Sequence, residues 1–265
     1  MIQKTAGQKD PIIQLLRELV SHDGRQKHNR FFVETKELVK RAFEYGGEVE
    51  SLIISERFLE DCGELIDQAQ LAARPVYSAT EGLLNKILDA KPTPECLAIV
   101  RRRTTSSSDV FAAQNPLVMM VESGDNADNL GMLLRSTDAA GVDGVILTAD
   151  TTDPFSRRVI RGSRGAIFTV PICPVHSSVK AITDAKNAGL RVVATSANAN
   201  VSYADVDMSK PTMIIVGSEH VGISEDVRTN ADMVVRIPMN GKINSLNIAV
   251  AASIMLYEAT RQRAR

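Results

Sequence analysis

Five short apolar segments recur along the second half of the chain, and amphipathic helical patterns separate them. Near-continuous apolar segments of this kind are typical of parallel strands that are buried on both faces of a sheet. The sequence therefore predicts an α/β domain with a mainly parallel sheet and helices on both faces. The expected strands are residues 117–122, 144–149, 191–196, 212–219 and 233–239, and the expected helices are residues 129–141, 179–189 and 245–263.

A polar stretch at residues 101–116 divides the chain into two parts. The stretch is rich in Arg, Ser and Thr, and such a composition has little apolar surface to bury. The residues before it alternate helical and strand patterns, which indicates a second, small α/β layer. The predicted domains are residues 1–104 and 116–265, and the predicted linker is residues 105–115.

The composition excludes several classes of protein. The chain carries 31 Lys and Arg against 32 Asp and Glu, so its net charge of -1 indicates no general preference for polyanions. Cys62, Cys96 and Cys173 lie far apart and form no CxxC pair, so neither a disulfide framework nor a metal site is expected. No apolar run approaches the roughly 18 residues of a membrane span. The N-terminus also lacks the apolar region of a secretory signal, so we expect a cytoplasmic protein.

The loops that follow the predicted strands are the expected place for a ligand, because α/β sheets bind ligands beyond the carboxyl ends of their strands. After the strand at 117–122, Asp128 or Asn129 is expected to cap a helix. Arg135 follows just under two turns later and can lie on roughly the same face. A helix N-terminus that carries Asn and Gly can bind an anion or a polar ligand.

Two further loops carry similar features. Gly217 ends a strand and permits close approach of the backbone, and Glu219 follows it. Ser245 is expected to cap the last helix, with Asn247 in its first turn. Each feature alone fits a simple helix cap or turn, whereas the three loops together favour a ligand site. No GxGxxG fingerprint or P-loop occurs, so an adenosyl cofactor would need a different backbone arrangement.

Three segments of the chain resemble the motifs of a known enzyme family. In order and spacing, DNLGMLLRSTDAAG, IIVGSEHVGIS and IPMNGKINSLNIAVAASIMLYE are similar to those of the SpoU (TrmH-type) family of SPOUT RNA 2′-O-ribose methyltransferases. The likeness covers about residues 115–262 and includes RRVIRGSRGAIFTVPI. The first domain resembles, more weakly, the L30e-like module with which many members hold RNA. The resemblance implies a deep trefoil knot in the C-terminal domain and a homodimer.

The resemblance also implies a reaction, which is methyl transfer from S-adenosylmethionine to a ribose 2′-hydroxyl of a structured rRNA or tRNA. The family's functional positions fall on Asn129, Arg135, Glu219, Ser245 and Asn247. The positions whose backbone typically cradles the cofactor fall on Gly217, Ile237 and Leu246. Because a guanidinium stays protonated at neutral pH, we expect Arg135 to bind phosphate and stabilise developing alkoxide charge rather than act as a base.

Four arginines occur within eight residues, with no acidic residue among them: Arg157, Arg158, Arg161 and Arg164. The cluster fits a solvated helix face, but in an RNA-modifying protein it predicts contacts with phosphates, aided by the arginines at 101–103. The clustered arginines, and not the net charge of the chain, thus indicate RNA as the partner.

Two alternative functions stay open at this point. One is a non-catalytic RNA-binding or ribosome-assembly factor with the same fold, against which the complete set of five functional positions counts. The other is an α/β nucleotide-binding hydrolase, which the absence of a P-loop and of a GxSxG nucleophile motif disfavours.

Overall fold

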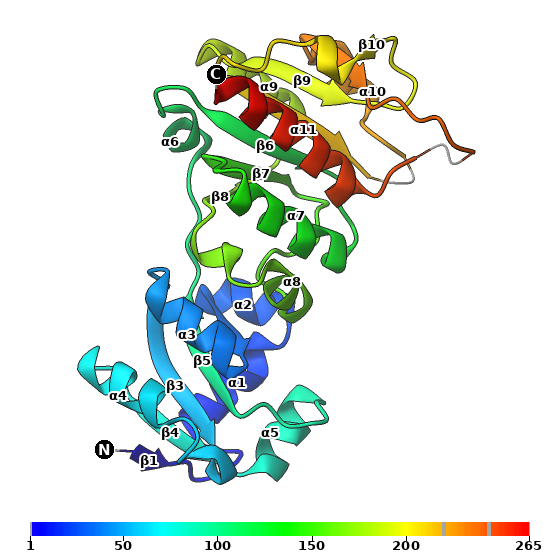
Figure 1. Ribbon diagram of the computed structural model, residues 1–265. Helices are drawn as coiled ribbons and strands as arrows, with labels where there is room; N and C mark the ends of the chain where they lie inside the picture. Colours follow the sequence, from blue (N-terminus) through cyan, green and yellow to red (C-terminus); the bar gives the residue numbers. More distant parts are fainter. Residues whose placement is uncertain (1, 219–220, 243–244, 265) are drawn as a thin grey trace. The chain divides into compact units, whose positions relative to one another are not determined.

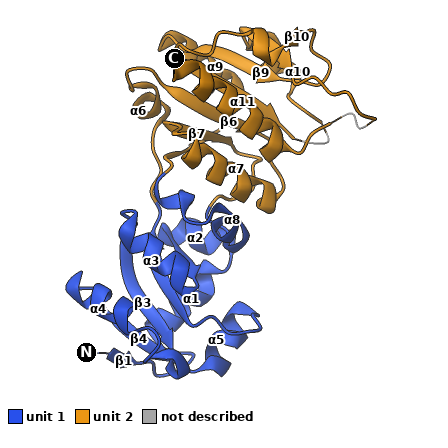
Figure 2. Cartoon of the chain, viewed as in Figure 1, with its two compact units in different colours: residues 1–102, 155–169 blue, residues 103–154, 170–265 orange. Residues whose placement is uncertain are grey.

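The structure is a computed structural model that describes residues 2–218, 221–242 and 245–264. The chain divides into two compact units (Figure 2). Unit 1 comprises Met1–Arg102 and Phe155–Thr169, and unit 2 comprises Arg103–Pro154 and Val170–Arg265.

Unit 2 is built on a seven-stranded sheet in which the described strands pair in parallel, in the order β10-β12-β9-β11-β6-β7-β8 (Figure 1). This confirms the predicted parallel α/β architecture. Two edge strands were not expected from the sequence, because one has only two residues and the other contains a proline. The strands are β6 (Leu117–Glu122), β7 (Gly144–Thr148), β8 (Ile172–Val175), β9 (Arg191–Thr195), β10 (Val201–Ser202), β11 (Thr212–Gly217) and β12 (Met233–Arg236).

Helices cover both faces of this sheet, which explains why its strands are apolar at almost every position. Figure 1 shows α7 (Ala127–Ala139) and α11 (Ile248–Arg263) side by side over one face. The other face packs against α6 (Ser107–Phe111), α9 (Ser178–Asn187) and α10 (Glu225–Asn230). Alternate strand residues therefore enter two different cores.

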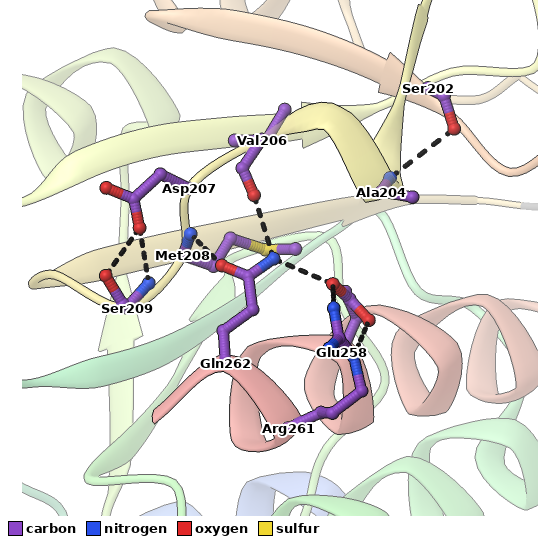
Figure 3. Close-up of polar contacts among 9 residues, drawn as sticks. All are labelled: Ser202, Ala204, Val206, Asp207, Met208, Ser209, Glu258, Arg261 and Gln262. Carbon is purple, nitrogen blue, oxygen red and sulfur yellow. Dashed lines mark hydrogen bonds and ion pairs between the residues drawn. The ribbon is translucent and has the colours of Figure 1, made fainter. Parts of the chain in front are cut away.

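The last turn of α11 is hydrogen-bonded to the chain at residues 206–210. Figure 3 shows the part of this contact that Gln262 makes with Val206 and Met208. The Gln262 amide donates from Nε2 to the Val206 carbonyl at 2.9 Å and accepts at Oε1 from the Met208 amide at 2.7 Å. Arg263 donates to four backbone carbonyls, including those of Met208 and Lys210. These contacts fix the carboxyl end of α11 within unit 2.

Unit 1 is a separate layer with a mixed five-stranded sheet of order β1-β4-β3-β5-β2, in which β5 runs antiparallel to both neighbours. Asp10 caps the first helix, because its Oδ1 accepts from the Ile12 amide at 3.1 Å. The strands are β1 (Ile2–Lys4), β2 (Arg30–Glu34), β3 (Val49–Ser55), β4 (Val76–Ala79) and β5 (Cys96–Arg101). The helices are α1 (Pro11–Leu19), α2 (His22–His28), α3 (Lys36–Glu44), α4 (Gly63–Leu71), α5 (Glu81–Leu88) and α8 (Arg157–Ser163).

The helix α8 and its flanks were expected in the second domain, but the structure groups residues 155–169 with unit 1. The reason is aromatic packing across a long sequence separation. The rings of Phe155 and Phe168 lie 5.1 and 6.3 Å from the ring of Phe31, which belongs to β2. The segment is therefore part of the core of unit 1.

The expected linker at 105–115 also differs from the structure, because it contains α6. Ser106 caps this helix by accepting from the Asp109 amide at 3.2 Å. Val110 and Phe111 are buried in the core of unit 2 among residues of α9 and the sheet. The segment is polar on average, but these two apolar side chains are enough to pack it against unit 2.

Among the described residues, no helix is long and apolar enough to cross a membrane. In the same part of the chain, no three His, Cys, Asp or Glu side chains group in a way that could hold a metal ion.

Candidate active site

A cavity of about 250 Å³ opens where the carboxyl ends of β9, β11 and β12 meet at one edge of the unit 2 sheet. This is the edge at which parallel α/β sheets bind ligands. Apolar side chains form much of its lining: Val216, Ile223, Ile237, Met239, Leu246 and Ile248. Its polar side chains include those of Thr195, Ser196, Asn198 and Arg228.

The three residues expected to cradle a cofactor, Gly217, Ile237 and Leu246, all line this cavity. Gly217 is required sterically, because a Cβ there would lie 2.2 Å from the Gly222 carbonyl carbon and oxygen. Gly222 has a φ of 75° and its amide donates to the Ser218 carbonyl at 2.8 Å. We refer to residues 217–218 and 221–224 as the cavity turn.

A smaller cavity adjoins the first and shares Ser218 and Ile248 with it. Its lining includes Asn129, which is only 6% exposed. The Asn129 Oδ1 accepts a hydrogen bond from the Asn247 Nδ2 at 2.9 Å. The structure thus brings together two of the predicted functional residues, which are 118 positions apart in the sequence.

The helix caps differ from those expected. Asn126, not Asp128 or Asn129, caps α7, since its Oδ1 accepts from the amides of Asp128 and Asn129 at 2.9 and 3.3 Å. Asn247, not Ser245, caps α11 and accepts at Oδ1 from the Ala249 amide at 3.0 Å. The observed cap lies two or three positions before the predicted residues at α7 and two positions after the predicted residue at α11.

One amide therefore serves two purposes at the start of α11. The Asn247 Oδ1 caps its own helix, so the Nδ2 of the same amide is directed to Asn129 in the first turn of α7. This hydrogen bonding also defines which end of the amide is oxygen. Ser245 is exposed and lines the larger cavity. Glu219 lies outside the described residues.

Arg135 lies on α7, about two turns beyond Asn129, and its side chain is exposed. It lines neither cavity. Within the described part of the chain, no hydrogen bond or ion pair holds its guanidinium. The group is therefore available to a phosphate or another anion.

The loop that leads into α7 is held by a cluster of hydroxyl groups. Thr148 donates to the Asp150 Oδ1 at 2.5 Å, and Ser123, which has a φ of 56°, donates to the Asp150 Oδ2. The hydrogen bond from Ser123, followed by that from Thr148, holds the pKa of Asp150 below its usual range. These contacts join the ends of β6 and β7 and place the residues before Asn126.

The four arginines around α8 do not form one uniform patch. The Arg157 guanidinium donates a hydrogen bond to each carboxylate oxygen of Glu34, at 3.1 and 2.7 Å. It also donates to the Leu88 carbonyl at 2.7 Å. The Arg164 Nη1 lies 3.6 Å from a Glu37 carboxylate oxygen. Arg158 and Arg161 are exposed. Arg157 thus stabilises unit 1 internally, since Glu34 compensates its charge.

Sequence reasoning missed several residues of this region. Thr195 ends β9, and Ser196 and Asn198 follow it, so the rule applied to the other three loops would have found them. Arg228 on α10 and the buried Glu122 at the end of β6 had no local pattern that distinguished them.

Comparison with known proteins relates the whole chain to RNA methyltransferases. The profile of the SpoU rRNA Methylase family matches residues 116–257. A TrmH family tRNA/rRNA methyltransferase of Staphylococcus saprophyticus is 31% identical over 232 residues, which cover 85% of this chain and 93% of the relative.

Solved structures extend the likeness to both units. An rRNA methyltransferase from Sinorhizobium meliloti with bound AdoMet has a TM-score of 0.87 and 28% identity, with 98% of each chain covered. A structure described as an RNA 2′-O ribose methyltransferase has a TM-score of 0.80 and 30% identity over the full length of both chains. The expected SPOUT fold class is thereby confirmed.

Proposed function

Because the chain belongs to the SpoU rRNA Methylase family, we propose that it transfers a methyl group from S-adenosylmethionine to a ribose 2′-hydroxyl of a structured rRNA or tRNA. The observation that carries the proposal is the meeting of Asn129 and Asn247 beside a cavity lined by all three predicted cofactor residues. The trefoil knot implied by the family resemblance stays a prediction.

The larger cavity fits an adenosyl cofactor in its chemistry. Its apolar side chains can enclose a purine, and the backbone of Gly217, Ile237 and Leu246 offers donors and acceptors without a glycine-rich fingerprint. Among the described residues, Arg228 is the charged side chain that lines it, and it can pair with the methionine carboxylate. When bound, S-adenosylmethionine supplies an electrophilic methyl group.

The chain's own residues then prepare the attacking hydroxyl. The linked amides of Asn129 and Asn247 form a rigid polar pair that can orient a ribose by hydrogen bonds. The exposed Arg135 binds the neighbouring phosphate and stabilises the negative charge that develops on the 2′-oxygen. Ser245, at the edge of the cavity, adds a hydroxyl that can hold the ribose, and Glu219 is expected to fix a neighbouring polar group.

A homodimer is part of the proposal. The helices α7 and α11 are joined by a hydrogen bond from the Ser253 hydroxyl to the Ser136 hydroxyl at 2.8 Å. Their outer faces expose Met132 (47%), Val250 (48%) and Tyr257 (55%), where a monomer would leave apolar surface in water. A second copy on this face would bring its surface close to Arg135, one turn from Met132.

Sedimentation of purified protein tests the dimer. Met132→Glu would place a charge in the contact and is expected to convert dimers to monomers. Leu71→Glu in unit 1, where the side chain is 89% exposed, is the matched control and should leave the dimer intact. A wild-type protein that sediments as a monomer would contradict this part of the proposal.

Unit 1 is proposed to hold the RNA, as the L30e-like module does in the family. The exposed Arg158 and Arg161 on α8 support this role, because lysine and arginine contacts with phosphates supply a large share of the affinity of proteins for nucleic acids. Arg157 contributes indirectly, since its pairing with Glu34 fixes α8 within unit 1.

Two measurements test the proposed reaction against the alternative of a non-catalytic RNA-binding factor. Calorimetry with S-adenosylmethionine should show binding, and labelled S-adenosylmethionine should transfer its methyl group to rRNA or tRNA from cells that lack the gene. A protein that binds RNA but neither binds the cofactor nor transfers the methyl group would be the non-catalytic factor.

A further inference from the structure

Glu122, the last residue of β6, is buried at 6% exposure, although an isolated carboxylate is costly to bury. Three hydrogen bonds compensate it. Its Oε2 accepts from the Ser224 amide at 2.8 Å, and its Oε1 accepts from the hydroxyls of Ser224 at 2.8 Å and Ser178 at 3.0 Å. The carboxylate therefore joins three segments that are far apart in the sequence.

Two of these three bonds are made to Ser224, the last residue of the cavity turn. Ser224 also caps α10, because its hydroxyl accepts from the Val227 amide at 3.2 Å. The other end of the cavity turn is continuous with β11, which pairs with β6 so that Gly217 lies beside Glu122. The turn is thus held to β6 at both ends, once by the sheet and once by the Glu122 carboxylate.

The described residues of the cavity turn before Ser224 line the larger cavity. Gly217, Ser218, Val221, Gly222 and Ile223 all contribute to its wall, and Arg228 lies one turn into α10. Glu122 itself lines neither cavity. Its side chain is connected to the cavity wall by its two hydrogen bonds to Ser224.

We propose that Glu122 is a positioning residue that fixes the cavity turn through Ser224 and thereby sets the affinity for S-adenosylmethionine. The inference rests on the proposed function, because it assumes that the cavity binds this cofactor. The contact with Ser178 belongs to the start of α9, which does not line the cavity, and serves stability alone.

The two serines allow a matched test, because each donates its hydroxyl to the same carboxylate oxygen. Ser224→Asp retains a good helix cap but places a second carboxylate against Glu122. Ser178→Ala removes a hydrogen bond of the same kind without touching the cavity turn. Calorimetric Kd values for S-adenosylmethionine and melting temperatures are measured for both variants, for Glu122→Gln and for the double variant E122Q/S224D.

Ser224→Asp and Glu122→Gln are expected to raise the Kd about tenfold or more, since each disrupts a hydrogen bond to a charged group. Under turnover conditions they should raise the KM for the cofactor and change kcat at saturation less than about threefold. In the double variant the glutamine amide can donate to the introduced carboxylate, so much of the affinity should return. Ser178→Ala should lower the melting temperature and keep the Kd within about twofold.

An unchanged Kd in Ser224→Asp would show that Glu122 acts only on stability. An equal rise in Ser178→Ala would show that the effect on affinity is not transmitted by Ser224. Either result would overturn the inference. Because Ser178→Ala and Ser224→Asp keep the carboxylate, the comparison holds even where Glu122→Gln does not fold. Wild-type protein that does not bind S-adenosylmethionine would instead contradict the proposed function, which makes the two failures distinguishable.

Discussion

The Asn247 side chain donates a hydrogen bond to the Asn129 side chain at 2.9 Å and so joins the first turns of α11 and α7. The same amide caps α11, and Asn129 lines the smaller of two adjoining cavities. Together with the hydrogen bond from Ser253 to Ser136, this pair couples the position of the last helix to that of the helix that carries Arg135.

Asn247→Asp separates the two roles of this amide. A carboxylate still caps α11, so the free energy of unfolding should change by less than about 0.5 kcal/mol. The donor to Asn129 is lost and a second acceptor faces it, so kcat should fall at least about tenfold. Asn247→Ala, which also loses the cap, should be less stable by about 1 kcal/mol in denaturant unfolding. Equal activity of Asn247→Asp and wild type would contradict the role of the pair.

Arg135→Lys tests whether the guanidinium geometry matters in the reaction. Lysine keeps the charge but cannot contact a phosphate with two parallel donors, so kcat should fall about 100-fold. Because Arg135 lines neither cavity, the Kd for S-adenosylmethionine should stay within about twofold of the wild-type value. Near wild-type turnover would show that a point charge suffices and would refute the assigned role.

Gly217→Ala should disrupt the cavity turn. Its Cβ would lie 2.2 Å from the backbone of Gly222, so the turn must shift, at a cost of about 1–3 kcal/mol in unfolding free energy. Cofactor binding should be lost with it. Gly82→Ala on α5 is the control, because a Cβ there meets no atom within 4 Å and should leave stability equal or slightly higher.

Substitution of the arginines of α8 should affect either RNA binding or the stability of the protein, depending on the residue. Replacing Arg158 and Arg161 by Glu is expected to weaken RNA binding. The binding constant should also depend less steeply on salt, so that the negative slope of its logarithm against log salt concentration becomes smaller in magnitude by about 1–2. Arg157→Ala breaks the pairing with Glu34 and should instead destabilise the protein by about 1–3 kcal/mol. If the double substitution changed neither the RNA affinity nor its salt dependence, α8 would not be part of the RNA-binding surface.

The strands of unit 2 could be predicted because burial on both faces leaves a local signature in the sequence. Each predicted strand is found within about three residues of its expected ends, as for β6 at Leu117–Glu122. The caps of α7 and α11 could not be predicted in the same way. Several adjacent Asn and Asp residues precede α7, and the residue that caps depends on where the chain leaves the sheet.

The placement of residues 155–169 shows a second limit of sequence patterns. Their apolar residues predict burial, but the partner ring of Phe31 is more than 120 positions away and leaves no local trace. The cavity could be predicted in outline, since parallel strands end at one edge. Its tie to Glu122 could not, because a carboxylate at a strand end is equally compatible with solvent.

The transfer of a methyl group to a ribose oxygen is the central claim, and analysis of the modified nucleoside tests it most directly. The wild-type protein is incubated with unmodified rRNA and tRNA and with labelled S-adenosylmethionine, and the RNA is then hydrolysed with alkali. A 2′-O-methyl group blocks cleavage at its own phosphodiester, so the account predicts that the label is recovered in an alkali-resistant dinucleotide. Label recovered in a mononucleotide, as after methylation of a base, would contradict it.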